Sequence, residues 1–312
     1  MALGETRIVL QASTSNFREI VVTAINLIET RDFSASRGVC RSSISVLTSR
    51  LAGLMHALFS HEPPTKTKVM PVQSVVPVLQ DAAVAAVYCS QRMGGDFYDF
   101  LRVSPDRVVL GLLDVAGRIE DNGAIISAAQ RTFRTFAPEL FAKEDINEAD
   151  AMSELALALN RTILQAQGSI RSCPAFAACY NETLGTLCYF NAGHTPGLLR
   201  DRTGIAELPA TGLPLGLFSH ATADARIVAL EPGASLLLVS LGLLESKYKD
   251  EEFGLGRLKD TFLHANSDHA RELCLSIINN VQQFMRTPPT HNDVTVLALV
   301  RAATAKALAV AG

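Results

Sequence analysis

The chain has 312 residues and a formal net charge of −3, with 48% hydrophobic and 19% charged residues. This composition supports a buried core and excludes a wholly disordered chain. No cluster of Lys and Arg stands out, so nucleic-acid binding is not expected. No apolar run reaches the roughly 18 residues of a membrane span, and the N-terminus lacks the features of a signal peptide. We therefore expect a cytoplasmic protein without membrane contact.

Residues 1–70 are predicted to be helical. Apolar residues recur at the spacing of one helix face within 17–28 and again within 44–58. Two such helices in succession predict a helical hairpin, and the Pro-containing stretch 61–68 after them predicts a linker. A hairpin alone buries its apolar faces poorly. It would pack either on the following domain or on a second copy of itself, which would make a regulatory homodimer.

The pattern changes after the linker. A nearly continuous apolar run, Val108–Leu113, predicts a buried strand that ends at Asp114. The elements predicted next are helices at 123–138 and 148–167, strands at 175–180, 186–191, 197–200, 205–208, 235–239 and 294–300, and a helix at 268–285. Turn residues between successive strands indicate hairpins and antiparallel sheets. Together, the predicted strands and helices indicate an α+β domain over residues 72–301, followed by a flexible tail at 302–312.

Six cysteines lie along the chain, and none forms a Cys-x-x-Cys pair. They are Cys40, Cys89, Cys173, Cys179, Cys188 and Cys274. Most stand in apolar stretches, and soft ligands are not clustered as structural zinc requires. The pattern predicts reduced, buried thiols.

Acidic residues recur at strand ends and in glycine-rich turns. Asp96 and Asp99 stand in Gly94–Asp99 (GGDFYD), Asp114 directly follows the buried strand, and Asp293 directly precedes the last strand. Carboxylates gathered from separate strand ends suit Mg²⁺ and Mn²⁺. Two such ions about 3.5–4 Å apart can hold a hydroxide and polarise a phosphate. Spacing alone does not separate this interpretation from ordinary turn or helix-cap aspartates.

The residue sequences of the motifs are more specific than their spacing. The motifs are GGDFYD at Gly94–Asp99, DVAG at Asp114–Gly117, NAGH at Asn191–His194, TGLPLGL at Thr211–Leu217 and EFG at Glu252–Gly254. In this order and spacing they resemble the SpoIIE-type family of metal-dependent protein serine/threonine phosphatases, and the resemblance covers residues 72–301. It implies a type 2C phosphatase-like sandwich of two antiparallel β-sheets flanked by helices.

The resemblance also implies a chemistry. Manganese or magnesium ions, two in the family, would lie at the edge between the sheets. Water bridging them would hydrolyse phosphoserine or phosphothreonine on a protein partner, with no covalent phosphoenzyme. In this family the partner is often a small anti-sigma-factor antagonist.

The matching positions imply roles for individual residues. Asp114 takes the position of the aspartate that bridges both metals, Val115 the position whose backbone carbonyl completes a metal shell, and Asp96 an acidic position near the second metal. Arg118 could contact a phosphate. The residues that support the motifs are Gly94, Gly95, Asp99, Gly117, His194 and Gly242. For His194, ordering of its turn by hydrogen bonding is the competing role.

Two metal-binding positions depart from the family pattern. The expected Ser/Thr-Asp-Gly motif reads Ser-Leu-Gly, so Leu241 replaces a metal-binding aspartate. In the last motif, aligned on Thr295, Asn292 replaces the other one. Asn292 still offers a carbonyl oxygen, and Asp293 lies one residue away, which on a strand turns it to the opposite face. One metal or none is therefore expected, and burial of Leu241 would favour an apolar pocket.

The sequence leaves two main functions open. The first is an active metal-dependent phosphatase, a hydrolase of bacterial signalling, which Asp96 and Asp114 support. The second is a pseudophosphatase that keeps the fold and binds a phosphorylated partner without hydrolysing it, which Leu241 and Asn292 support. A third interpretation is a dimeric scaffold assembled through residues 1–70.

Overall fold

The structure is a computed structural model, and it describes residues 74–89, 96–115, 119–166, 172–220, 223–265, 269–286 and 293–303. Several predictions lie outside these residues. They are the helical hairpin within 1–70, the end of the tail at 304–312, Cys40, Gly94, Gly95, Gly117, Arg118 and Asn292.

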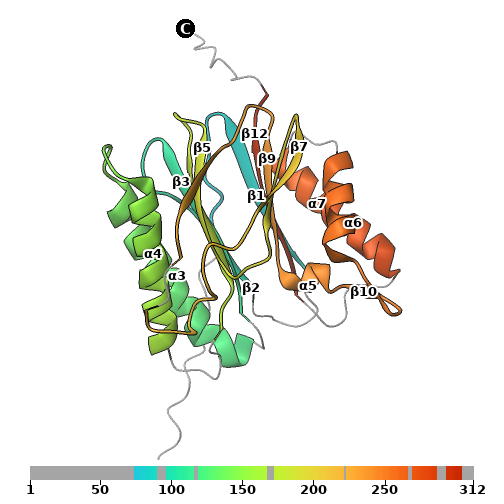
Figure 1. The fold of residues 1–312 in the computed structure, drawn as a ribbon, viewed down its shortest axis with the longest axis horizontal. Helices are drawn as coiled ribbons and strands as arrows, with labels where there is room; N and C mark the ends of the chain where they lie inside the picture. Colours follow the sequence, from blue (N-terminus) through green and yellow to red (C-terminus); the bar gives the residue numbers. More distant parts are fainter. Residues whose placement is uncertain are drawn as a thin grey trace, which may run out of the picture. The chain divides into compact units, whose positions relative to one another are not determined.

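Two five-stranded sheets pack face to face (Figure 1). In spatial order, the first sheet contains β1 (Ala82–Cys89), β12 (Val294–Arg301), β9 (Ser235–Val239), β6 (Gly197–Asp201) and β7 (Gly204–Leu208). The second contains β2 (Asp96–Arg102), β3 (Arg107–Asp114), β4 (Ala175–Asn181), β5 (Thr186–Ala192) and β8 (Arg226–Ala229). Neighbouring strands in both sheets are antiparallel. This confirms the predicted α+β class with two antiparallel sheets.

Helices cover the outer face of each sheet (Figure 1). The pair α3 (Ile119–Phe141) and α4 (Glu148–Gln165) packs on the second sheet, and the pair α6 (Gly254–His264) and α7 (Ala270–Met285) packs on the first. Between β9 and α6 lie the short helix α5 (Leu241–Leu244) and a hairpin of β10 (Lys247–Tyr248) and β11 (Glu251–Glu252). Three apolar layers result: one between the sheets and one under each helix pair.

The strand β3 shows why its sequence is apolar almost throughout. Val109 and Leu113 pack in the layer under α3 and α4, whereas Leu110 and Leu112 pack in the layer between the sheets. Because successive side chains of a strand point to opposite faces, a strand covered on both faces needs apolar residues at every position. The strand ends at Asp114, as the sequence predicts.

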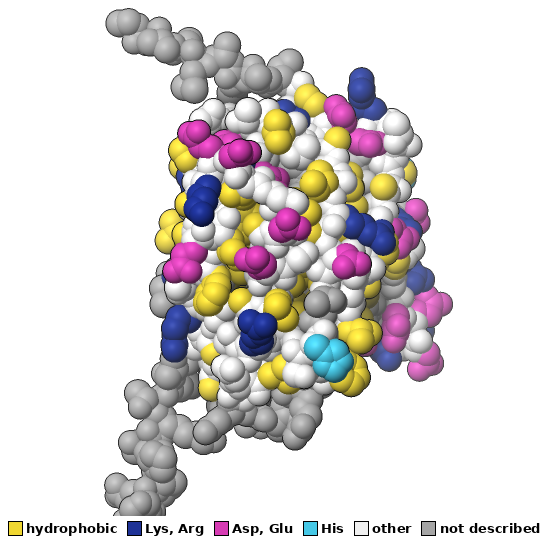
Figure 2. Space-filling model, turned by 60° about the vertical axis from the view of Figure 1, so that its left-hand side comes forward, with side chains coloured by type: hydrophobic (Ala, Val, Ile, Leu, Met, Phe, Trp, Pro, Cys, Tyr) yellow, Lys and Arg dark blue, Asp and Glu magenta, His cyan; other side chains and the backbone are white. Residues whose placement is uncertain are grey.

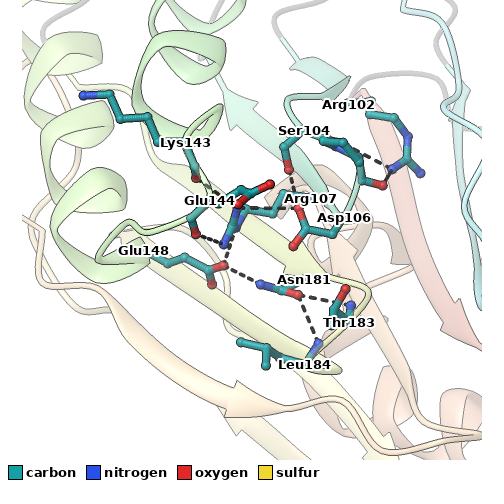
Figure 3. A network of polar contacts seen from close by, with 11 residues as sticks. Arg102, Ser104, Asp106, Arg107, Lys143, Glu144, Glu148, Asn181, Thr183 and Leu184 are labelled. Carbon is teal, nitrogen blue, oxygen red and sulfur yellow. Dashed lines mark hydrogen bonds and ion pairs between the residues drawn. The ribbon is translucent and has the colours of Figure 1, made fainter.

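A buried polar network fastens the connection between α3 and α4 to the second sheet (Figure 3). Nε of Arg107 and Nδ2 of Asn181 each donate to Oε1 of Glu148 over 2.7 Å. Arg107 also donates to the backbone carbonyls of Lys143 and Glu144, both at 3.2 Å. Arg107 begins β3, so the network lies at the end of this strand opposite to Asp114.

Charged side chains of both signs share one face of the domain (Figure 2). Figure 2 shows the side on which α3 and α4 come forward, and there basic and acidic side chains are interspersed among hydrophobic ones. In the described part of the chain, no helix combines the length and the apolar character that a membrane span requires.

Candidate functional site

The site is built around two aspartates at the ends of neighbouring strands. Asp96 is the first residue of β2 and Asp114 the last residue of β3, and they are direct partners in the antiparallel register. Directly opposed residues of such a pair have Cβ atoms about 4.5–5.5 Å apart on one face of the sheet. The structure therefore brings together the two carboxylates that the sequence placed in the catalytic and metal roles.

The pairing affects the protonation of Asp96. The pKa of its carboxyl is raised to about 7, first because the group is buried and second because the charge of Asp114 lies beside it. Asp293 adds to the rise, while the hydroxyls of Thr295 and Ser240 oppose it. Two negative charges are thus unfavourable here unless a proton or a cation compensates one of them.

Thr295 joins the first sheet to this pair. It is the second residue of β12, it is fully buried, and its hydroxyl donates a hydrogen bond of 2.6 Å to Oδ2 of Asp96. In the sequence, Thr295 serves only as the position on which the last motif is aligned, and this contact was not predicted. Its position two residues after Asp293 on a buried strand carried no signal for the contact.

Leu241 contacts the site through its backbone N–H and not through its side chain. Its N–H donates to Oδ2 of Asp114 over 3.0 Å, at the first residue of α5. The side chain is 45% exposed, so the expectation that a buried Leu241 would favour an apolar pocket is wrong. The physical reason is that α5 begins immediately after β9 and directs the side chain outward, whereas its first N–H groups have no partner within the helix.

Ser240 holds the start of α5 against β12. Its backbone N–H donates to the carbonyl of Thr295, and its hydroxyl accepts from the N–H of Thr295, both at 3.0 Å. The same hydroxyl donates to the carbonyl of Asp293 at 3.3 Å. The carboxylate of Asp293 accepts a hydrogen bond of 3.1 Å from the hydroxyl of Tyr88 in β1.

Asp99 has a separate role in the structure. It is fully buried, and Oδ2 lies 2.7 Å from Nε of Arg134 in α3. Gln130 of the same helix also donates to it. Since Asp96 and Asp99 are an odd number of residues apart on β2, their side chains point to opposite faces. Asp99 fastens α3 to the second sheet.

His194 lies in the turn between β5 and β6 and is buried. Its Nδ1 is 3.1 Å from both the carbonyl and the hydroxyl oxygen of Thr195. That hydroxyl donates to the carbonyl of Val239 over 2.6 Å, so Nδ1 must carry the ring proton. Burial lowers the pKa of His194, although its backbone contact to Thr195 and the charge of Asp114 oppose this. These bonds fit a histidine that orders its turn.

Of the other predicted site residues, Val115 follows Asp114 with its side chain buried, and Gly242 lies within α5. Within the described ranges, no group of three or more His, Cys, Asp or Glu side chains is placed to hold a metal ion. Asp96 and Asp114 supply two carboxylates, Leu241 supplies none, and both carboxylates already accept a hydrogen bond from the protein. These residues do not fit a centre of two hard dications, which needs more oxygen ligands.

Comparison with known proteins identifies the class. The family model of stage II sporulation protein E (SpoIIE) matches residues 104–302. The chain therefore belongs to the SpoIIE family, and together with the two-sheet fold this defines a PP2C-type serine/threonine phosphatase domain.

Particular relatives agree with the class. The chain is 23% identical over 215 residues to the phosphoserine phosphatase RsbU of Bacillus subtilis, covering 68% of this chain and 61% of RsbU. It is 23% identical over 248 residues to protein IcfG of Synechocystis sp., covering 72% of this chain and 39% of IcfG. The chain thus spans less than two thirds of the length of these curated relatives.

Two solved structures share the fold. The first contains the RsbU and RsbW domains of Rv1364c from Mycobacterium tuberculosis, with a TM-score of 0.60 and 26% identity over 73% of this chain and 64% of that one. The second contains the PP2C phosphatase domain and a regulatory fragment of SpoIIE from Bacillus subtilis, with a TM-score of 0.57 and 16% identity over 72% of this chain and 64% of that one.

Proposed function

We propose that this domain recognises a phosphorylated serine or threonine on a protein partner in bacterial signalling and has lost efficient two-metal hydrolysis. One observation carries the proposal. Leu241 stands where a metal carboxylate is expected, and its backbone N–H donates to Oδ2 of Asp114. A backbone donor thus hydrogen-bonds to a carboxylate oxygen that would otherwise be available to coordinate a cation.

Electrostatics supports the same conclusion. A two-metal centre concentrates positive charge, and each missing carboxylate removes one full negative charge that would balance it. Manganese or magnesium therefore has at most one set of ligands here, formed by Asp96 and Asp114 with the backbone carbonyl of Val115. Asn292 is an additional, weaker oxygen ligand in this proposal, and Arg118 is the phosphate contact.

A second candidate function is hydrolysis of the partner's phosphate with an altered metal shell. The pairing of Asp96 and Asp114 in register favours it, because the two carboxylates that remain are also adjacent. In that case one divalent cation would neutralise the pair and supply Lewis-acid assistance to an attacking water.

The deciding experiment is Mn²⁺-dependent hydrolysis of an aryl phosphate and of a phosphoserine peptide. Three proteins are compared: the native chain, Asp114→Asn, and the double variant Leu241→Asp with Asn292→Asp. We expect no metal-dependent turnover in the native chain and turnover in the double variant. Turnover in the native chain that disappears in Asp114→Asn would refute the proposal and establish the second candidate.

We propose further that the partner resembles an anti-sigma-factor antagonist, that the protein acts in the cytoplasm, and that residues 1–70 form a regulatory region that mediates a homodimer. The resemblance of the motifs supports the first point, and the amphipathic periodicity within 17–28 and 44–58 supports the last. Light scattering of the chain with and without residues 1–70 tests the dimer. A monomer in both forms would contradict it.

A further inference from the structure

Two cations lie over one aromatic ring at the β10–β11 hairpin. Nζ of Lys249 is 5.5 Å from the ring centroid of Tyr248, and Cζ of Arg286 is 4.7 Å from the same centroid. Lys249 belongs to the turn of the hairpin, whereas Arg286 ends α7. Both residues are exposed, so their charged groups are open to a ligand.

The backbone at both residues is unusual. Lys249 has φ of 55° and Arg286 has φ of 58°, and in the described part of the chain these are the two non-glycine residues with positive φ. Glycine is the residue usually found in this conformation, both after a helix and in a tight hairpin turn. Residues held in a sparsely populated backbone conformation are often found at functional sites.

The ring beneath the cations is fixed to the core. Tyr248 packs edge-on against Phe284 of α7, with centroids 6.2 Å apart. Phe284 in turn packs against the buried Phe253, with centroids 5.5 Å apart. A ring held in this way orients both cations before a ligand arrives, which lowers the entropic cost of binding.

The acidic residues of the hairpin are mostly committed elsewhere. Glu252 pairs with Lys247 at 3.2 Å, and Glu251 pairs with Arg257 at 2.7 Å. Among the residues described, no carboxylate lies within ion-pair distance of Lys249 or Arg286. Both cationic groups lie near the same ring, and an anion that contacts them would compensate their charges.

We propose that Lys249 and Arg286 form an oxyanion-binding site, separate from Asp96 and Asp114, that takes phosphate or carboxylate groups of a protein partner. Arginine and lysine over an aromatic ring suit this chemistry, because the guanidinium offers paired donors and the ammonium adds a point charge. The hairpin follows α5, whose first residue contacts Asp114, so one segment links both sites (Figure 1). The proposal does not depend on hydrolysis at the aspartates.

Glycine substitutions separate binding from packing. In the double variant Lys249→Gly with Arg286→Gly, the backbone conformation becomes favourable, so we expect an unchanged or higher Tm. Its affinity should fall at least about tenfold, since charge-assisted hydrogen bonds are lost. Affinity is measured by fluorescence anisotropy on the full chain, with a labelled phosphoserine peptide and an unphosphorylated Glu-rich peptide.

The control is Lys247→Gln, which removes a charge from the same hairpin but one already paired with Glu252. It should leave both affinities unchanged. Weakening of the phosphopeptide alone would identify phosphate as the ligand, and weakening of both peptides would identify carboxylates. Failure of the native chain to bind either peptide would overturn the proposal, as would equal affinities of the native chain and the double variant. If the glycine variant does not fold, the Asn pair replaces it, because Asn also tolerates this conformation.

Discussion

The hydroxyl of Thr295 donates a hydrogen bond of 2.6 Å to Oδ2 of Asp96, and this bond joins the last strand of the first sheet to the first strand of the second. In a type 2C centre, metal ions bound by carboxylates from both sheets would make such a connection. A hydroxyl and the backbone N–H of Leu241 also reach the two aspartates.

The Thr295 bond should contribute measurably to stability. Thr295→Val keeps the shape of the side chain but leaves the buried carboxylate without this donor. We expect the free energy of unfolding to fall by about 1–3 kcal/mol, as measured by urea denaturation with EDTA present. Thr203→Val is a matched control, because the Thr203 hydroxyl donates to Asp201 in an exposed turn. An equal loss in both variants would contradict the assigned role.

The metal-free domain should lose stability as pH rises toward neutrality. The pKa of Asp96 is raised to about 7 in the folded protein from 3.8, so the folded state binds this proton more tightly than the unfolded state. The stabilisation is therefore complete below about pH 4 and is lost as pH rises through about 7, with a slope of at most about 1.4 kcal/mol per pH unit.

Urea denaturation of the native chain and of Asp96→Asn between pH 4 and 8, in EDTA, checks this expectation. The native free energy of unfolding should decline relative to that of the variant, which lacks the titrating group. Parallel pH profiles of the two proteins would refute the assignment of the shift to Asp96.

The Arg107–Glu148 ion pair should contribute more to the stability of the fold than an exposed ion pair does. Glu148→Gln leaves the buried guanidinium of Arg107 with only its longer ion pair to Asp106, at 3.5 Å. Loss of one partner of a buried pair typically costs about 3–5 kcal/mol. Glu252→Gln breaks the exposed pair with Lys247 and should cost about 0–1 kcal/mol. Thermal denaturation of both variants measures the difference. Similar losses would mean that the Figure 3 network is not a main anchor of α4.

The buried cysteines should resist alkylation in the native state. Burial raises the pKa of Cys188 and of Cys274 to about 12 in each case, and it raises the pKa of Cys179 well above its ordinary value. The thiolate is the reactive form, so little of it exists at pH 8. We expect mass spectrometry after iodoacetamide treatment to find these residues modified only in denaturant, with the partly exposed Cys89 as the internal comparison. Rapid native labelling of Cys188 would contradict this.

Much of the fold follows from the sequence because burial on both faces leaves a clear apolar pattern. The strand ending at Asp114 and the helix over Glu148–Gln165 lie close to where the periodicity predicts them. The strand β1 was missed because Ala82–Cys89 is rich in alanine, which has a low strand propensity. The strand β8 was missed because its four residues, Arg226–Ala229, are too few to show a period.

The site was only partly predictable for a different reason. Asp96 and Asp114 were predicted as site residues because they stand in recognisable sequence motifs. Their adjacency follows because β2 and β3 pair in one hairpin. The contacts of Thr295 and Leu241 depend on how the two sheets face each other, and no local pattern encodes that relationship. The sequence did not predict the pairing of Lys249 and Arg286, because a charged residue in a turn is usually a surface residue in contact with solvent.

The strand order has a consequence for biosynthesis. Within the described residues, the strand β1 stands at the edge of the first sheet and pairs with β12 alone, from Ala82 opposite Arg301 to Cys89 opposite Val294. On the ribosome, β1 is therefore made before every other strand of the two sheets but finds its neighbour only when the chain reaches residue 301. Until then β9 also lacks one of its two neighbours. Such long-range pairing slows folding, so nascent chains that end before β12 are the species most exposed to aggregation and chaperone capture.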